Sequence, residues 1–102
     1  MNVYSLQIST VPGLADSAFL DRLADIVYGI DALANLAIGL NDDGSLTASF
    51  DVQGANPLAA ADSGVELFAN AVVRAASAPL DATAALDGFS IAHAHGHELA
   101  TA

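Results

Sequence analysis

Three histidines near the C-terminus are the residues whose types and spacing could support chemistry. His93, His95 and His97 alternate with small residues, and Glu98 follows the last of them. In an extended strand all three would point to one face, with neighbouring Cα atoms about 6.6–7 Å apart, so two imidazoles could reach one metal ion. The outer two would lie about 13 Å apart, which is too far for one ion on a straight strand. The run therefore predicts a site with two histidine ligands, unless Gly96 bends the chain.

The metal interpretation names His93, His95, His97 and Glu98 as ligands. Imidazole nitrogen suits ions such as Zn or Ni, and further carboxylates could complete the coordination. The alternative is a strand that runs out into solvent with three ordinary surface histidines, and the incomplete ligand set favours it. We therefore expect no cofactor, with Zn or Ni as the ion to test. At a subunit contact the histidines would respond to pH, because protonating all three near pH ~6.5 changes the formal charge from −10 to about −7.

Other catalytic and binding motifs are absent from the sequence. There is no cysteine, which excludes disulfides, iron–sulfur clusters on thiolates and a thiol nucleophile. The Asn-Asp-Asp-Gly segment at 41–44 is much shorter than a calcium loop, and no glycine-rich phosphate loop or G-x-S-x-G motif occurs. Asp51, His93 and His95 are the acid–base groups that a small enzyme could use. Enzymatic activity is left open, and the lack of a catalytic set argues against it.

The composition restricts the class of protein. With 102 residues and 10.2 kDa, the chain is long enough for one domain and too short for two. Twelve acidic residues against two arginines give a formal charge of −10, which disfavours binding to nucleic acid and to anionic membranes. No apolar run approaches the ~18 residues needed to span a bilayer, and the first residues do not resemble an export signal. We expect an acidic, cytoplasmic protein.

In the first half of the chain, the spacing of the apolar residues changes from that of a strand to that of a helix and then back to that of a strand. Residues 3–9 alternate between apolar and polar types, which predicts a half-buried strand. From Asp16 the apolar residues recur every three or four positions, and Asp16 or Ser17 can cap the helix that this spacing predicts. Residues 35–40 and 46–52 alternate again on either side of the turn at 41–44, so they form a hairpin.

The second half repeats the order with a helix and then a strand. Asn56 and Pro57 are a helix cap and a first helical residue, and Pro79 stops the helix near Ser77. A last alternation begins at Phe89 and continues through the histidines. Residues 80–87 are a connection, and residues 98–102 are expected to be a frayed tail. The apolar stripe of this helix comprises Leu58, Ala61, Val65, Phe68, Val72 and Ala75.

This strand, helix, strand, strand, helix, strand order resembles the ferredoxin-like plait. The resemblance implies an α+β two-layer sandwich over residues 1–102, a single domain. Its four-stranded antiparallel sheet would have the order 4-1-3-2, with both helices on one face. The Ala-rich, Lys-free composition is similar to that of small uncharacterised proteins of high-GC bacteria. Neither resemblance implies a catalytic residue, because plaits host many unrelated functions.

The uncovered face of such a sheet bears on function. It would carry small and polar residues with no aromatic, Lys or Arg side chain, which excludes the base-stacking surface of RNA-binding plaits. The face is either simply solvated or a surface on which a second sheet packs, and a dimer could instead pair edge strand 2 or edge strand 4 with its copy. We expect a non-catalytic assembly module, as a homodimer or a subunit of a larger complex. A metal-binding protein and a small enzyme are the alternatives. The residues of the face are Ser5, Gln7, Ser9, Ala37, Gly39, Thr47, Ser49, Asp51, Ser90, Ala92 and Ala94.

Overall fold

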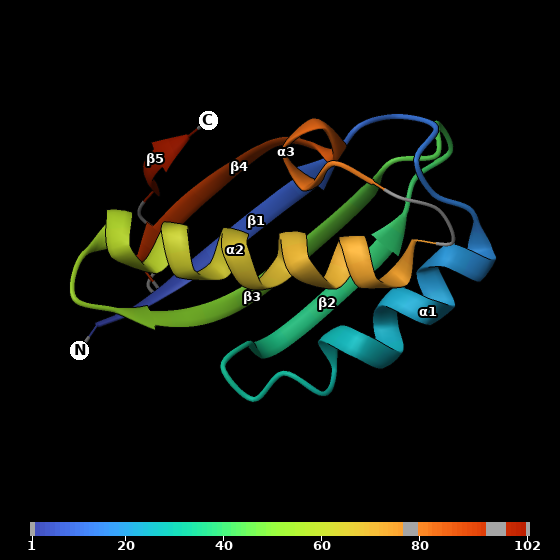
Figure 1. Cartoon of the computed structure of the whole chain (residues 1–102). Coiled ribbons are helices and arrows are strands. Elements are labelled where there is room, and N and C mark those ends of the chain that lie inside the picture. Colours follow the sequence, from blue (N-terminus) through green and yellow to red (C-terminus); the bar gives the residue numbers. More distant parts are fainter. Residues whose placement is uncertain (1, 77–79, 94–97, 102) are drawn as a thin grey trace.

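The computed structural model describes residues 2–76, 80–93 and 98–101 of the chain. Figure 1 shows its strands and helices in chain order. The elements are β1 (Asn2–Thr10), α1 (Ser17–Val27), β2 (Ala34–Leu40), β3 (Leu46–Gly54), α2 (Pro57–Ala75), the short α3 (Ala82–Ala85), β4 (Leu86–His93) and β5 (Glu98–Thr101).

The strands form one antiparallel sheet in the order β2-β3-β1-β4-β5. Its first four strands have the predicted order 4-1-3-2, read from the other edge. The long helices α1 and α2 lie together on one face of the sheet (Figure 1). The α+β two-layer sandwich of the ferredoxin-like type is therefore confirmed.

The core lies between the sheet and the two helices. In β1 every second residue is buried, because alternate side chains of a strand point to opposite faces. Phe50 of β3 and Phe68 of α2 meet in the middle of this layer, with ring centroids 6.4 Å apart and planes tilted by 34°. The largest buried side chains around them are Tyr4, Leu6, Ile8, Leu23, Leu46, Val27, Val72 and Ile91.

Side-chain hydrogen bonds fix the start of both long helices and the end of α2. Asp16 Oδ1 accepts from the Phe19 amide at 2.8 Å, and Asn56 Oδ1 accepts from the Ala59 amide at the same distance, as the capping pattern predicts. At the other end of α2, Arg22 Nε donates to the Ala75 carbonyl oxygen at 2.7 Å. A cation is favourable there because the last carbonyls of a helix carry partial negative charge. Arg22 thus ties α1 to the end of α2.

The turn between β2 and β3 accounts for the acidic pair at 41–44. Gly44 has a φ of +81°, the left-handed conformation that tight hairpin turns require and that glycine adopts without strain. Asp43 Oδ1 accepts from the Ser45 hydroxyl at 2.6 Å and from the Ser45 amide at 2.9 Å. These hydrogen bonds hold the pKa of Asp43 below its ordinary value, because they stabilise the ionised form. The carboxylate serves the turn and needs no ion.

The C-terminal part differs from its prediction. The last main strand begins at Leu86 rather than Phe89, and Glu98–Thr101 pair with it as β5 rather than forming a frayed tail. Residues 90–92 of β4 pair with β5, which satisfies backbone groups that would otherwise be unpaired at the sheet edge. β5 runs antiparallel to β4, with Ala92 in register with Glu98. The predicted continuation of the alternation through His95 and His97 lies outside the described residues.

Candidate functional site: the open sheet face and a notch beside it

The sheet face opposite the helices is uncovered by any described element. The register places Gln7 in the middle of the face, between Ser49 of β3 and Ser90 of β4, and a shallow hollow of about 260 Å³ lies over these strands. Gln7 and Ser49 are exposed there. We define the open face as the ten described members of the predicted set: Ser5, Gln7, Ser9, Ala37, Gly39, Thr47, Ser49, Asp51, Ser90 and Ala92.

The open face is poor in charge although the chain is strongly acidic. Asp51 is its one charged residue, and Ala94, the remaining member of the predicted set, lies outside the described residues. The other acidic residues of the described ranges lie in helices, caps, turns and the first part of β4, away from the middle of the sheet. They are Asp16, Asp21, Asp25, Asp31, Asp42, Asp43, Asp62, Glu66, Asp81 and Asp87, together with the backbone of Glu98 in β5.

Asp51 is held from both sides by neutral donors. The Ser5 hydroxyl donates to Asp51 Oδ1 at 2.7 Å, and Asn35 Nδ2 donates to Asp51 Oδ2 at 2.8 Å. Ala34 pairs with Asp51 and Ala37 pairs with Ser49, so β2 has one more residue than β3 between these two pairs. Asn35 lies in the bulge that results, and its φ is +53°. Asparagine tolerates this left-handed conformation better than most residues. The carboxylate is half-buried and fixed in orientation.

A notch adjoins this carboxylate. The last pair between β2 and β3 is Ala34 with Asp51, and β3 continues for residues 52–54 without a β2 neighbour. A groove of about 370 Å³ lies at this place. We call it the notch. It is lined by Val3, Asp31, Ala32, Ala34, Asn35, Asp51, Val52, Gln53 and Ser63.

Sequence reasoning missed the notch and the role of Asn35. It placed Asp51 on the open face, which the register confirms, and considered it as an acid–base partner of His93 or His95. His93 is in register with Tyr4, a residue of the helix-covered side, whereas Asp51 is in register with Ser5 of the open face. Their backbones thus lie on the two strands that flank β1. His95 lies outside the described residues, so the acid–base prediction stays a prediction.

The predicted metal ligands are only partly within the described chain. His95 and His97 lie outside it, while the backbones of His93 and Glu98 end β4 and begin β5. Within the described ranges, no three His, Cys, Asp or Glu side chains are grouped so that they could hold a metal ion. The ligand prediction for His93, His95, His97 and Glu98 therefore stays a prediction.

Comparison with other proteins does not assign this site. No protein-family model, curated protein or solved structure matches the chain. In the described part of the chain, no helix is both long and apolar enough to cross a membrane. The open face, the notch and the charge of the chain are the features that bear on function.

Proposed function

We propose that this protein is a non-catalytic assembly module of the cytoplasm that forms a homodimer by packing two open faces together. The observation that carries the proposal is a charge-poor face on a chain with a formal charge of −10. Two copies repel each other wherever their acidic surfaces meet, and this repulsion is strong within the screening length of about 8 Å at physiological salt. Contact through the open face keeps the acidic helix faces apart.

The side chains of the open face suit a close approach of two sheets. Alanine, glycine, serine and threonine project little from the sheet, and stacked sheets pack about 10 Å apart. A two-fold axis brings the same patch of both copies into contact, so one surface supplies both halves of the interface. Asp51 lies at the end of the face beside the notch, where water can still solvate it.

Edge pairing is less suited to the dimer. At one edge, β5 pairs with residues 90–92 of β4, which shortens the stretch of β4 that a copy could pair with. At the other edge, the bulge at Asn35 breaks the regular spacing of β2. Bulges are one of the devices by which edge strands avoid pairing with another chain. The open face therefore supports a homodimer better than either edge does.

Replacing Ser49 by arginine tests the dimer. The wild-type protein should have twice its chain mass of 10.2 kDa in light scattering coupled to size exclusion at micromolar concentration. Ser49→Arg should raise the dimer dissociation constant about tenfold or more, because it places a long charged side chain in the middle of the contact. The substitution lowers the net negative charge, so general repulsion between copies would fall rather than rise.

Asn70→Arg is the matched control for this variant. Asn70 is exposed on α2, so the same change in charge falls outside the proposed contact, and the dimer should persist. A wild-type protein that is monomeric at every concentration would refute the homodimer. Equal dissociation constants for Ser49→Arg and Asn70→Arg would instead show that the two copies meet through another surface.

The second candidate function is metal binding by His93, His95, His97 and Glu98. The antiparallel pairing of β4 with β5 favours it, because Ala92 is in register with Glu98 and the backbones of His93 and Glu98 therefore lie close together on neighbouring strands. Calorimetric titration with Zn or Ni should show one saturable site, weakened at least about tenfold in His93→Ala and in His95→Ala. No binding, or equal binding by both variants and the wild type, would exclude a metal site on this run.

A further inference from the structure

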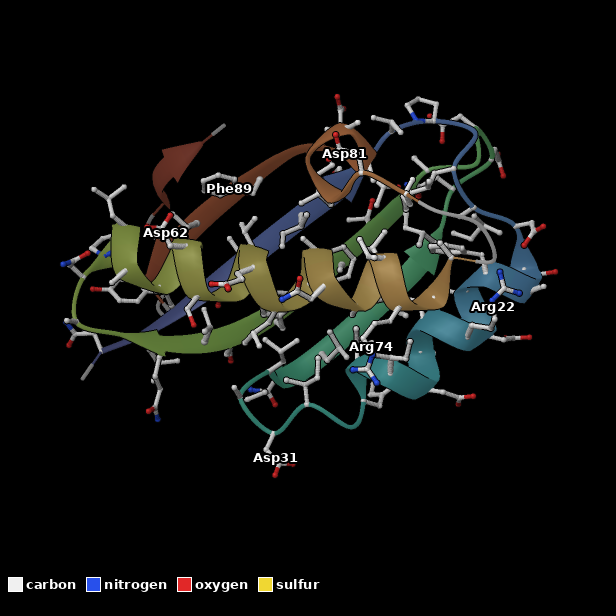
Figure 2. All side chains as sticks on the ribbon, in the orientation of Figure 1. Arg22, Asp31, Asp62, Arg74, Asp81 and Phe89 are labelled. Atoms are coloured by element: carbon white, nitrogen blue, oxygen red, sulfur yellow. The ribbon has the colours of Figure 1, made fainter. Side chains whose placement is uncertain are left out.

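The notch beside Asp51 combines a groove with a carboxylate that has no cationic partner in the described part of the chain. Its two hydrogen-bond donors, Ser5 and Asn35, are neutral. Figure 2 shows both arginines on the helices, with Arg22 on α1 and Arg74 on α2, and Asp31 directed outward from the loop at the rim of the notch. The two donors orient the carboxylate without neutralising its charge.

We propose that the notch binds a small organic cation with a primary ammonium group, and that Asp51 is its anchor. The groove of about 370 Å³ falls in the size range of small-molecule sites. Each Asp51 oxygen accepts one hydrogen bond from the protein and retains capacity for another, while an ammonium group has three donors to place. Gln53 and Ser63, also in the lining, carry an amide oxygen and a hydroxyl oxygen as further hydrogen-bond acceptors in the notch.

The rest of the notch fits the carbon chain of such a ligand. Val3, Ala32 and Ala34 supply apolar surface, and 39% of the Val3 surface is exposed. The β3 backbone at 52–54 has no β2 neighbour, so the ligand lies where the sheet leaves an open edge. The bulge that holds Asn35 against Asp51 sets the orientation of the carboxylate before the ligand arrives, which reduces the ordering that binding requires.

Other ligand classes fit the notch less well. An anion would meet two carboxylates and no positively charged side chain among the lining residues. A transition metal or calcium needs several ligands at once, and the described residues bring no three suitable side chains together. A neutral ligand would leave the Asp51 charge uncompensated. The formal charge of −10 also raises the local concentration of cations around the protein.

Titration with n-butylammonium, followed by amide NMR shifts of the full-length protein, tests this proposal. Saturable shifts should appear at Asn35, Asp51, Gln53 and Ser63, at ligand concentrations where n-butanol and butyrate cause none. The uncharged and anionic compounds have similar carbon chains, so the comparison isolates the ammonium group. Equal shifts from n-butanol, or shifts spread over the acidic helix faces, would overturn the proposal.

Two pairs of variants separate a specific site from general attraction of cations. Asp51→Asn should weaken n-butylammonium binding at least tenfold, whereas Asp25→Asn, an equal loss of charge on the exposed surface of α1, should leave it unchanged. Ser63→Lys places a competing ammonium at the notch without touching the hydrogen bonds of Asp51 and should abolish the shifts, whereas Asn70→Lys on the same helix should not. Undiminished binding by Asp51→Asn or by Ser63→Lys would refute the site. Light scattering reports the dimer separately from these shifts, so failure of the site and failure of the dimer are distinguishable.

Discussion

Phe68→Ala should lower the free energy of unfolding by about 3–5 kcal/mol, the range for truncating a buried phenylalanine. Phe68 is fully buried, and its ring packs against Phe50 in the middle of the layer between α2 and the sheet. The loss combines the transfer free energy of the ring with the cavity that its removal leaves. Domains of this size have about 5–15 kcal/mol of stability in total, so the variant should unfold at markedly lower urea concentration.

Leu58→Ala is the matched control on the same helix. The sequence pattern assigns Leu58 to the apolar stripe with Phe68, yet 70% of its surface is exposed. Its truncation should therefore change the unfolding free energy by less than about 0.5 kcal/mol. Urea titrations followed by circular dichroism measure both variants, with the denaturant slope checking that the transition stays two-state. Similar losses for Leu58→Ala and Phe68→Ala would mean that the described packing of α2 is wrong.

The order of the first four strands and two long helices could be predicted because its signals are local. The alternation in β1 and β3 reports which side of each strand is buried, and the buried positions of Leu6 and Phe50 follow it. Asn56 and Pro57 mark the start of α2 because a capping side chain acts within one turn. Right-handed crossovers then leave one arrangement for the sheet.

The elements that sequence reasoning missed depend on contacts between distant segments. β5 exists through its pairing with β4, and the short run Glu98–Thr101 has no strong pattern of its own. Leu58 belongs to the apolar stripe predicted for α2, but it is the second residue of that helix and most of its surface is exposed. A periodic stripe marks one side of a helix and does not show how much of its length the sheet covers.

Of the candidate site, the open face could be predicted from the sequence and the notch could not. The open face follows from strand alternation and register, so its composition could be predicted residue by residue. The notch follows from where β2 ends against β3 and from the bulge at Asn35, which are properties of a strand pair. An asparagine inside an apolar strand was the available signal, because it tolerates positive φ and can hydrogen-bond nearby groups. The histidine run was more conspicuous in the sequence, yet it falls mostly outside the described chain.

Gly64→Ala should lower the free energy of unfolding by about 1–3 kcal/mol, although the same change in an exposed helix raises it by about 1 kcal/mol. Gly64 is buried in the middle of α2. A Cβ atom added there would lie 2.5 Å from Leu6 Cδ2 and 3.0 Å from Phe50 Cε1, and both side chains are themselves buried in the core. The helix must move away from β1 and β3, or these side chains must leave their preferred rotamers, and either costs more than the gain in helix propensity.

A double-mutant cycle with Leu6→Val attributes this loss to the contact. Valine lacks the Cδ2 atom that the new methyl group meets, so Gly64→Ala should cost about 1 kcal/mol less in the Leu6→Val background than in the wild type. Ser63→Ala, at the exposed neighbouring position, controls for helix propensity and should be neutral or slightly stabilising. Urea unfolding of the four proteins of the cycle gives the coupling. If Gly64→Ala instead stabilises the wild type, α2 does not approach β1 as closely as described, because a helix with room for the methyl group gains from alanine.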